Sequence, residues 1–371
     1  MGLKGAVGFS RYRKRKERGE IFPAFQFISV TNDCNLHCQG CWVSKGAKAS
    51  SISETQIHAI INESKKQGSY FFGILGGEPL MYPSLLKIFK EHPDCYFQLF
   101  TNGTLLSDEI AAGLRKTGNV TPLISLEGEE NVVDLRRGAK QVYKRTIQAI
   151  DTATKHRLIT GVAVSVCKSN LAMALSEEFI QMLAKKGVLY LWYYIFRPVG
   201  ENPSNQLALD ASEIEKLRRF MVEGRSKFPI VIIDSYWDAD GKPFCPAAEG
   251  LSHHISPEGF IEPCPVIQFA TDKIGNGDLH QIYESSDFLK QFRHEVKLKT
   301  NGCILMEDPA WVADFAKKHQ AINTSNRDSM PDDLHAAKSF PSHGSCPQIP
   351  EKHFLYRFAK KRAFFGLGAY G

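Results

Sequence analysis

Three cysteines within eight residues are the feature of this sequence best suited to chemistry. Cys34, Cys38 and Cys41 follow a short apolar segment, and three thiolates this close in the chain can converge on one metal centre. Two interpretations are open. A zinc knuckle takes a fourth ligand such as His37, whereas an iron–sulfur cluster with three protein ligands keeps one iron open for a substrate or cofactor. The position directly after a strand-like segment favours the open cluster.

Short strand-like segments that alternate with helical patterns must position these cysteines. Ser107 can cap a helix that Gly118 closes, and Ser51 to Glu54 read as a capping box before another helix. Six strands, each followed by a helix, imply parallel crossovers, so the sheet is either doubly wound or curled into a full or partial β/α barrel. In both folds ligands bind at the carboxyl ends of the strands. The six predicted strands are residues 25–30, 70–75, 96–100, 121–126, 161–166 and 189–196.

The composition is that of an ordinary globular protein. Of 371 residues, 43% are hydrophobic and 23% are charged, which excludes disordered and collagen-like chains. The longest apolar run, residues 188–196, is far shorter than the roughly 20 residues of a membrane-spanning helix. The first 20 residues lack the apolar core of a secretory signal, so we expect a cytoplasmic protein. In that reducing compartment the nine cysteines are better explained as metal ligands or reactive thiols than as disulfides.

The positive charge is concentrated at the two ends of the chain. The net charge is +6, but residues 1–18 carry +6 and residues 352–371 carry +5, which leaves −5 for the rest. A nucleic-acid-binding core is therefore not indicated. Both ends mix cations with aromatic residues, which suits peripheral contact with an anionic membrane; the alternative is two solvated, frayed ends.

The CxxxCxxC spacing of Cys34, Cys38 and Cys41 resembles the signature of the radical S-adenosylmethionine (radical SAM) superfamily. Gly76-Gly77-Glu78-Pro79, after the second strand, is similar to that family's GGEP loop. The resemblance implies that the open iron of a [4Fe-4S] cluster binds S-adenosylmethionine. An external one-electron reductant then drives its cleavage to a 5′-deoxyadenosyl radical. Glycines let the backbone approach a ligand, and Glu78 or nearby carbonyls would meet the cofactor's amino group.

Further segments extend this resemblance over roughly residues 22–200. Thr101-Asn102-Gly103 resembles the family's TNG, and Ser125-Leu-Glu127-Gly128 resembles its S-[ILV]-[DE]-G. By the same analogy, Ser125 and Arg137 would face the ribose or carboxylate of S-adenosylmethionine, with Asn102 and Ser165 beside them. The alternative treats Asn102-Gly103 as a tight turn and Arg137 as a surface cation.

A second group of cysteines lies in the last third of the chain. Cys245, followed by Gly259 and Cys264, resembles the opening of the SPASM and twitch extensions, which hold auxiliary iron–sulfur clusters. Cys303 and Cys346 supply two more ligands, so four thiols could complete one auxiliary [4Fe-4S] cluster. The alternative is four unrelated thiols.

Two cysteines remain outside both groups. Cys95 opens the third strand and is predicted to be a buried small hydrophobe. Cys167 lies at the end of the fifth strand, on the face where ligands bind. A thiol there could donate a hydrogen atom to a substrate radical, so Cys167 is our candidate catalytic residue; plain packing is the alternative.

These observations predict an α/β protein, a partial (β/α)6 TIM-like barrel with a small C-terminal iron–sulfur extension. We expect a basic arm at residues 1–20, the barrel at 21–235, an auxiliary-cluster region at 236–350 and a basic-aromatic tail at 351–371. The expected function is radical SAM chemistry on a peptide or protein. The alternatives are radical modification of a lipid or isoprenoid at a membrane surface, and a non-catalytic iron–sulfur or zinc protein.

Overall fold

A curled sheet forms the centre of the protein. The computed structural model describes residues 2–44, 49–201, 203–234, 236–275, 279–344 and 348–362. Its main sheet has nine strands in the order β7-β6-β5-β4-β3-β2-β1-β8-β9. The six predicted strands are confirmed, and they lie side by side in chain order as parallel neighbours: β1 (Phe25–Ser29), β2 (Phe71–Leu75), β3 (Tyr96–Thr101), β4 (Val120–Ser125), β5 (Gly161–Val166) and β6 (Tyr190–Ile195).

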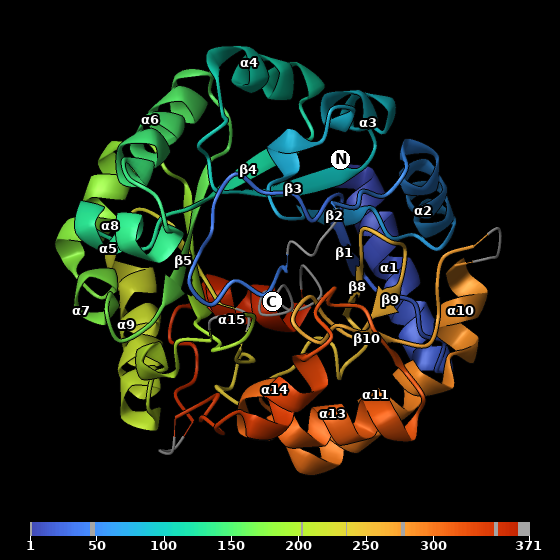
Figure 1. Cartoon of the computed structure of the whole chain (residues 1–371). Coiled ribbons are helices and arrows are strands. Elements are labelled where there is room, and N and C mark those ends of the chain that lie inside the picture. Colours follow the sequence, from blue (N-terminus) through green and yellow to red (C-terminus); the bar gives the residue numbers. More distant parts are fainter. Residues whose placement is uncertain are drawn as a thin grey trace.

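Helices cover the outside of this sheet, so the predicted partial TIM-like barrel is confirmed (Figure 1). Ser107 caps α4 and Gly118 closes it with a φ of 70°, as expected. The predicted capping box is wrong by two residues, because Ser51 still pairs with Thr31 as a β-bridge and the box falls on Ser53 and Gln56. The helices between β1 and β7 are α2 (Glu54–Lys66), α3 (Leu85–Glu91), α4 (Asp108–Thr117), α5 (Glu130–Arg137), α6 (Val142–Lys155), α7 (Leu171–Ala174), α8 (Glu177–Lys185) and α9 (Ala211–Lys227).

The C-terminal part of the chain joins the same sheet. After β7 (Val231–Ile233), β8 (Ser252–Ile255) pairs in parallel with β1, and β9 (Ile261–Glu262) follows as an antiparallel edge. The remaining elements pack along the open side of the barrel (Figure 1): β10 (Phe269–Ala270), α10 (Leu279–Ser285), α11 (Asp287–Lys299), α12 (Ile304–Glu307), α13 (Pro309–Lys318), β11 (Ile322–Asn323) and α14 (Met330–Ala336).

Large side chains fill the barrel interior where the strands begin. Tyr190 and Trp192 of β6 contact Phe25 and Phe27 of β1 together with Leu123 of β4, and all five are buried. The alternation of side chains along each strand directs these residues inward. The space that remains therefore lies toward the carboxyl ends of the strands.

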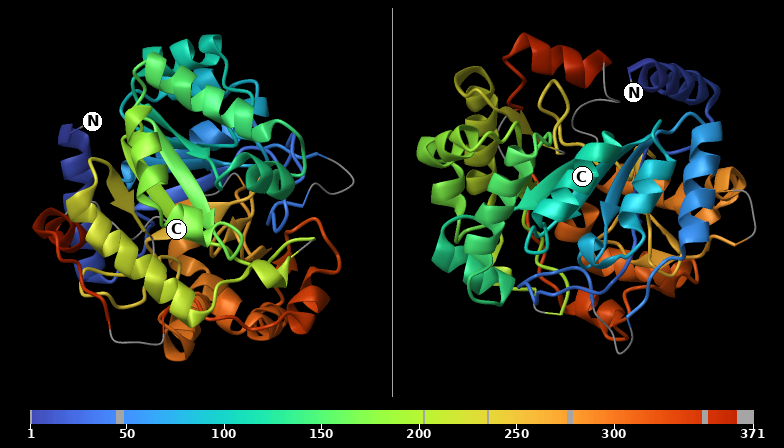
Figure 2. Two further views of the ribbon diagram at one scale, coloured as in Figure 1. Left: turned by 90° about the vertical axis from the view of Figure 1, so that its left-hand side faces the viewer. Right: turned by 90° about the horizontal axis from the view of Figure 1, so that it is seen from above.

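The two basic ends are helices that lie on one side of the molecule. Figure 2 shows α1 (Gly2–Arg18) and α15 (Phe354–Arg362) together on the side opposite α12–α14. Helix α1 is packed rather than frayed: the Gly8 backbone approaches Gly68, just before β2, and Arg15 is buried against the Phe22 ring. Within the described ranges, we find no helix with the length and apolar character to cross a bilayer.

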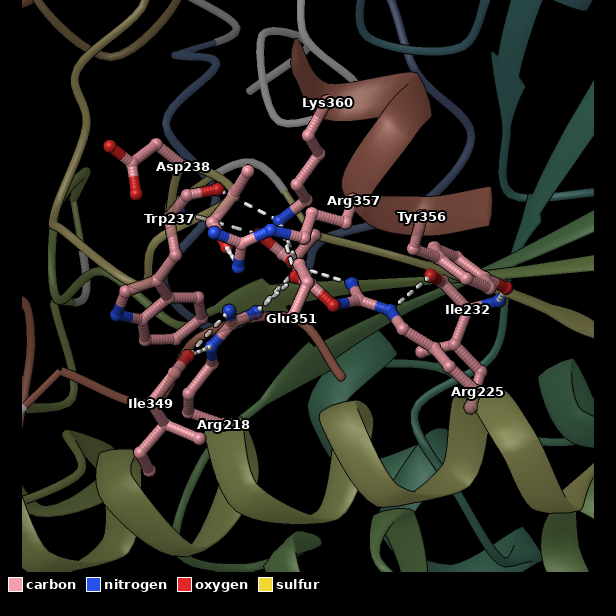
Figure 3. A network of polar contacts seen from close by, with 12 residues as sticks. Arg218, Arg225, Ile232, Trp237, Asp238, Ile349, Glu351, Tyr356, Arg357 and Lys360 are labelled. Carbon is pink, nitrogen blue, oxygen red and sulfur yellow. Dashed lines mark hydrogen bonds and ion pairs between the residues drawn. The ribbon is translucent and has the colours of Figure 1, made fainter. Parts of the chain in front are cut away.

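Helix α15 is held by a buried ionic network (Figure 3). Arg218 and Arg225 of α9 and Lys360 of α15 surround Asp234 and Glu351, and none of these five side chains is more than 2% exposed. Lys360 Nζ lies 2.9 Å from Glu351 Oε1 and 3.1 Å from Asp234 Oδ2. Residues 351–362 of the predicted tail are therefore part of the folded body, and the rest of the tail lies outside the described residues.

Candidate active site

The first three cysteines lie together in the loop after β1. All three are half-buried, and the Cys41 N–H donates to the Cys38 carbonyl over 3.4 Å. Burial, with a further contribution from Cys38 and Cys34, raises the pKa of Cys41 to about 12. A free thiol there keeps its proton at neutral pH, so binding as a thiolate requires a compensating positive centre. Gly40, with a φ of 65°, leaves room for the Phe196 ring beside this loop.

The loop at residues 76–79 is bound to the cysteine loop through its backbone. The Gly77 N–H donates to the Thr31 carbonyl at 2.7 Å, and the Glu78 N–H donates to the Asp33 carbonyl at 2.8 Å. A Cβ atom on Gly77 would lie only 2.1 Å from the Asp33 carbonyl oxygen. Glycine is therefore required for this approach, and the loop fixes the start of the cysteine segment.

The Glu78 carboxylate points into the protein. One oxygen accepts from the Thr101 hydroxyl at 2.6 Å and from the Leu80 N–H at 3.0 Å, and the other accepts from the Asn102 N–H at 2.8 Å. Burial raises the pKa of Glu78, whereas these hydrogen bonds oppose the shift. The Asn102 side chain donates in turn to Asn35 at 2.9 Å. The Glu78 carboxylate thus fixes Asn102, and the Asn102 side chain in turn braces the cysteine loop at Asn35.

We expect Glu78→Gln to lower the free energy of unfolding by about 1–3 kcal/mol. The new amide would place a donor opposite the Asn102 N–H or the Thr101 hydroxyl in a buried site, and one hydrogen bond would be lost. Urea unfolding followed by tryptophan fluorescence measures the change. Glu109→Gln, the same substitution at an exposed position of α4, is the control. Equal losses in the two variants would contradict this bracing role.

Arg137 contacts a cysteine of the first group. Its guanidinium forms a two-point pair with the Glu127 carboxylate, Nε lying 2.7 Å from Oε2, and its Nη1 lies 3.7 Å from Cys38 Sγ. Burial alone would lower the pKa of Arg137, but Glu127 and Cys38 raise it above its ordinary value. The surface-cation alternative is therefore wrong, because the Arg137 side chain is only 15% exposed and its guanidinium contacts a carboxylate and a cysteine.

Arg136, for which the sequence motifs predict no role, also lines the site. Its Nη1 donates to the Ser165 carbonyl at 2.8 Å, and its guanidinium lies 5.2 Å from the centre of the Phe196 ring. Its Nε is buried and has no hydrogen-bond partner among the described residues. Two adjacent arginines at a helix end are equivalent in the sequence, and only the fold decides which one meets a thiol.

One cavity of about 330 Å³ joins these groups at the carboxyl ends of the strands. Of the predicted cofactor-binding residues, Ser125, Arg137 and Ser165 line it, whereas Gly76, Gly77, Glu78, Pro79 and Asn102 are not among the lining residues. Tyr194 of β6 also lines the cavity, and its buried hydroxyl has no hydrogen-bond partner within the described ranges. The cavity thus offers a set of polar groups on otherwise apolar walls.

The second group of cysteines lines the same cavity. Cys245, Cys264 and Cys303 are all half-buried and come from three separate segments, with Cys303 at the N-terminus of α12. The Cys303 N–H donates to the Ser342 hydroxyl at 2.8 Å, so the segment that leads to Cys346 starts beside Cys303. Cys346 itself lies outside the described residues. The alternative of four unrelated thiols does not hold for these three.

The spacing of the thiols fits clusters better than single ions. Four sulfurs around one zinc at about 2.3 Å lie about 3.8 Å apart. In the part of the chain that the structure describes, neither group of cysteines brings three ligand atoms within 4.8 Å of one another. A cluster spreads its cysteine ligands over several irons, so wider spacing is what it needs. The residues present therefore fit iron–sulfur clusters.

The last two cysteines are structural. Cys95 is fully buried in the apolar core, which confirms its prediction. Cys167 is also fully buried, its Sγ lies 3.1 Å from the Ser169 hydroxyl, and it is not among the residues that line the cavity. This packing argues against the predicted hydrogen-atom donor: β5 ends at Val166, so Cys167 does not continue the strand on which Ser165 lines the cavity, and its thiol lies next to Ser169.

Comparison with known proteins decides the family. Residues 28–175 match the family model described as the Radical SAM superfamily. The chain carries a radical SAM domain at these residues. It is a radical SAM enzyme, and this family uses a [4Fe-4S] cluster with S-adenosylmethionine. The non-catalytic alternative is therefore not supported.

Curated relatives of this radical SAM enzyme include two maturation proteins. Sporulation killing factor maturation protein SkfB of Bacillus subtilis is 28% identical over 301 residues, which is 76% of this chain and 70% of SkfB. Mycofactocin maturase MftC of Mycobacterium tuberculosis is 24% identical over 298 residues, covering 75% of this chain and 74% of MftC. Among solved structures, SuiB of Streptococcus suis bound to S-adenosylmethionine has a TM-score of 0.65 at 16% identity, with 76% and 71% of the two chains covered. That likeness supports the fold.

Proposed function

We propose that this enzyme removes a hydrogen atom from a peptide substrate. Cys34, Cys38 and Cys41 would hold the open cluster, and Cys245, Cys264 and Cys303 would hold an auxiliary one. When bound, the open cluster and S-adenosylmethionine supply the 5′-deoxyadenosyl radical. The observation that carries the proposal is that one cavity is lined by cysteines of both groups.

The chain's own residues prepare this cavity. Arg137, which pairs with Glu127, places its guanidinium 3.7 Å from Cys38 Sγ. Ser125 and Ser165 offer hydroxyl groups to the ribose or carboxylate of a cofactor. The Tyr194 hydroxyl, which has no hydrogen-bond partner among the residues that the structure describes, can bind a polar group of the substrate.

A peptide is the substrate class that two observations support. The relatives SkfB and MftC are named as maturation proteins, and SuiB was solved with precursor peptide SuiA. In this chain a second hollow of about 230 Å³ shares Trp42, Val199 and Val266 with the cavity and continues along α14. Its other walls combine apolar residues such as Leu334 and Ala337 with polar ones such as Gln268 and Asp333. Such a groove suits an extended peptide segment that leads into the cavity.

The lipid or isoprenoid alternative receives less support from the geometry. Both basic helices, α1 and α15, lie on the same side of the molecule (Figure 2). Helix α1 packs against Gly68, which precedes β2, so this side is close to the amino end of that strand. The cavity lies at the opposite ends of the strands, around Ser125 and Ser165. A membrane bound by α1 and α15 would therefore not meet the cavity.

Deuterium transfer distinguishes the two substrate classes. The anaerobically reconstituted enzyme is given dithionite as the electron donor, S-adenosylmethionine and either a pool of perdeuterated peptides or a perdeuterated lipid extract. We expect deuterium in 5′-deoxyadenosine with the peptide pool. Transfer from the lipid extract alone would overturn the peptide assignment, and no transfer from either would reject both.

Filling the groove along α14 is expected to reduce deuterium transfer from peptides by at least about tenfold. Ala337→Trp would place a large ring in the groove without touching the cysteines or the cavity walls. Cleavage of S-adenosylmethionine without peptide should be unchanged. Ser339→Trp, at an exposed position outside the groove, is the matched control. Equal transfer by the two variants would mean that the peptide enters elsewhere.

A further inference from the structure

Arg197 connects the end of β6 with the second group of cysteines. Its Nε donates to Cys303 Sγ at 3.3 Å, and its guanidinium lies 5.2 Å from the centre of the Tyr236 ring. All three residues line the cavity. Tyr236 is itself fixed, because its hydroxyl oxygen accepts from the Ile195 N–H at 3.1 Å. The guanidinium is therefore held between a ring and a thiol.

The positive charge of Arg197 acts on the whole group of thiols. Cys245, Cys264 and Cys303 line the same cavity as Arg197, and the guanidinium donates to one of them. An arginine guanidinium stays protonated at every pH at which a protein is folded. Arg197 thus stays charged next to sulfur atoms that a cluster needs as thiolates.

We propose that Arg197 sets the reduction potential of the auxiliary iron–sulfur cluster. The inference rests on the proposed function, since it takes Cys245, Cys264 and Cys303 as cluster ligands. Hydrogen bonds to the sulfurs and local charge are among the factors that determine a cluster's potential. Reduction adds one electron and one negative charge. A fixed cation that donates to a ligand sulfur therefore stabilises the reduced form and raises the potential.

Potentiometric titration followed by electron paramagnetic resonance tests this role. The reconstituted full chain carries Ala at positions 34, 38 and 41, so that the auxiliary cluster alone gives the signal. We expect Arg197→Gln to shift the one-electron equilibrium toward the oxidised form by at least about tenfold, which is about 59 mV. Arg197→Lys should recover most of the shift, because it retains the charge.

Arg136→Gln is the matched control. Arg136 also lines the cavity and is charged, but it binds Ser165 and a phenylalanine ring rather than a thiol of this group. Arg136→Gln should leave the one-electron equilibrium constant of the cluster within a few-fold of the parent value. The same titration on the holoenzyme, with all cysteines present, checks that the midpoint potentials of the variants keep the same order.

Three results would overturn the inference, and they are distinguishable. An unchanged midpoint in Arg197→Gln with full iron content would show that Arg197 does not tune the cluster. Loss of iron in both Arg197→Gln and Arg197→Lys would show that Arg197 is needed to hold the cluster rather than to tune it. Absence of iron in the parent with Arg197 intact would instead refute the auxiliary cluster, while formation of 5′-deoxyadenosine by the wild type would still stand.

Discussion

Replacing Cys34, Cys38 and Cys41 together with Ala is expected to abolish formation of 5′-deoxyadenosine and to remove about four irons per chain. The three thiols are half-buried in one loop, beside the cavity that the sequence-distant Cys245, Cys264 and Cys303 also line. The second group should therefore retain its iron. The measurements are iron content after anaerobic reconstitution and chromatography of the products after addition of dithionite and S-adenosylmethionine.

Two single substitutions are the controls for this result. Cys95→Ala and Cys167→Ala remove buried thiols that do not line the cavity. Both variants should retain the full iron content and form 5′-deoxyadenosine. If Cys167→Ala cleaved S-adenosylmethionine but left a substrate unmodified, Cys167 would regain the catalytic role that its burial argues against. Zinc in place of iron in the wild type, with no cleavage, would contradict the cluster assignment itself.

Asp234→Asn is expected to lower the free energy of unfolding by about 3–5 kcal/mol. Asp234 is fully buried and contacts Arg218, Arg225 and Lys360, so the amide would leave three buried cations to Glu351 alone. Urea unfolding followed by tryptophan fluorescence measures this loss. Asp240→Asn is the control: it removes a carboxylate that also pairs with α15 but is 47% exposed, and it should change stability little.

The effect of Asp234→Asn should depend on pH in one direction. Burial alone would raise the pKa of Asp234, but Lys360, Arg225 and Arg218 hold it well below its usual range. A depressed pKa in the folded state contributes stability above the unfolded value of about 4, and this stability is lost as the pH falls below it. The difference between wild type and variant should therefore be constant from pH 8 to pH 5 and shrink at lower pH. A difference that grows on acidification would contradict the assignment.

The sequence predicted the elements whose signals are local. The six strands are short apolar segments between helix signals, and Ser107 and Gly118 mark the two ends of α4 through side-chain capping and a left-handed residue. The first group of cysteines was recognisable from residue type and spacing, because its three members lie within eight residues of one another directly after a strand. The capping box was misplaced because Ser51 pairs with Thr31, which is 20 residues away and invisible to a local pattern.

What the sequence could not supply are contacts between distant segments. Nothing near Glu78 indicates that its carboxylate binds Thr101 and Asn102, which lie on another strand end. Likewise, α5 presents two consecutive arginines, and their assignment to a thiol and to Ser165 depends on how the helix docks. The tail was interpreted as a membrane contact or a solvated end, because a buried lysine is expected only with an anionic partner, and the partner of Lys360, Asp234, lies 126 residues away.

The network at α15 also has a consequence for the order in which a growing chain completes its fold. Arg218 and Arg225 are synthesised 133 and 126 residues before their partner Glu351. Before Glu351 is made, a nascent chain therefore has two arginines and only one carboxylate, that of Asp234, beside the outer strand β7. The Ile232 N–H of this strand also has to wait for Tyr356, whose hydroxyl oxygen accepts its hydrogen bond in the complete chain. All six cysteines that line or flank the cavity are made before Glu351. Metal loading can thus precede the docking of α15.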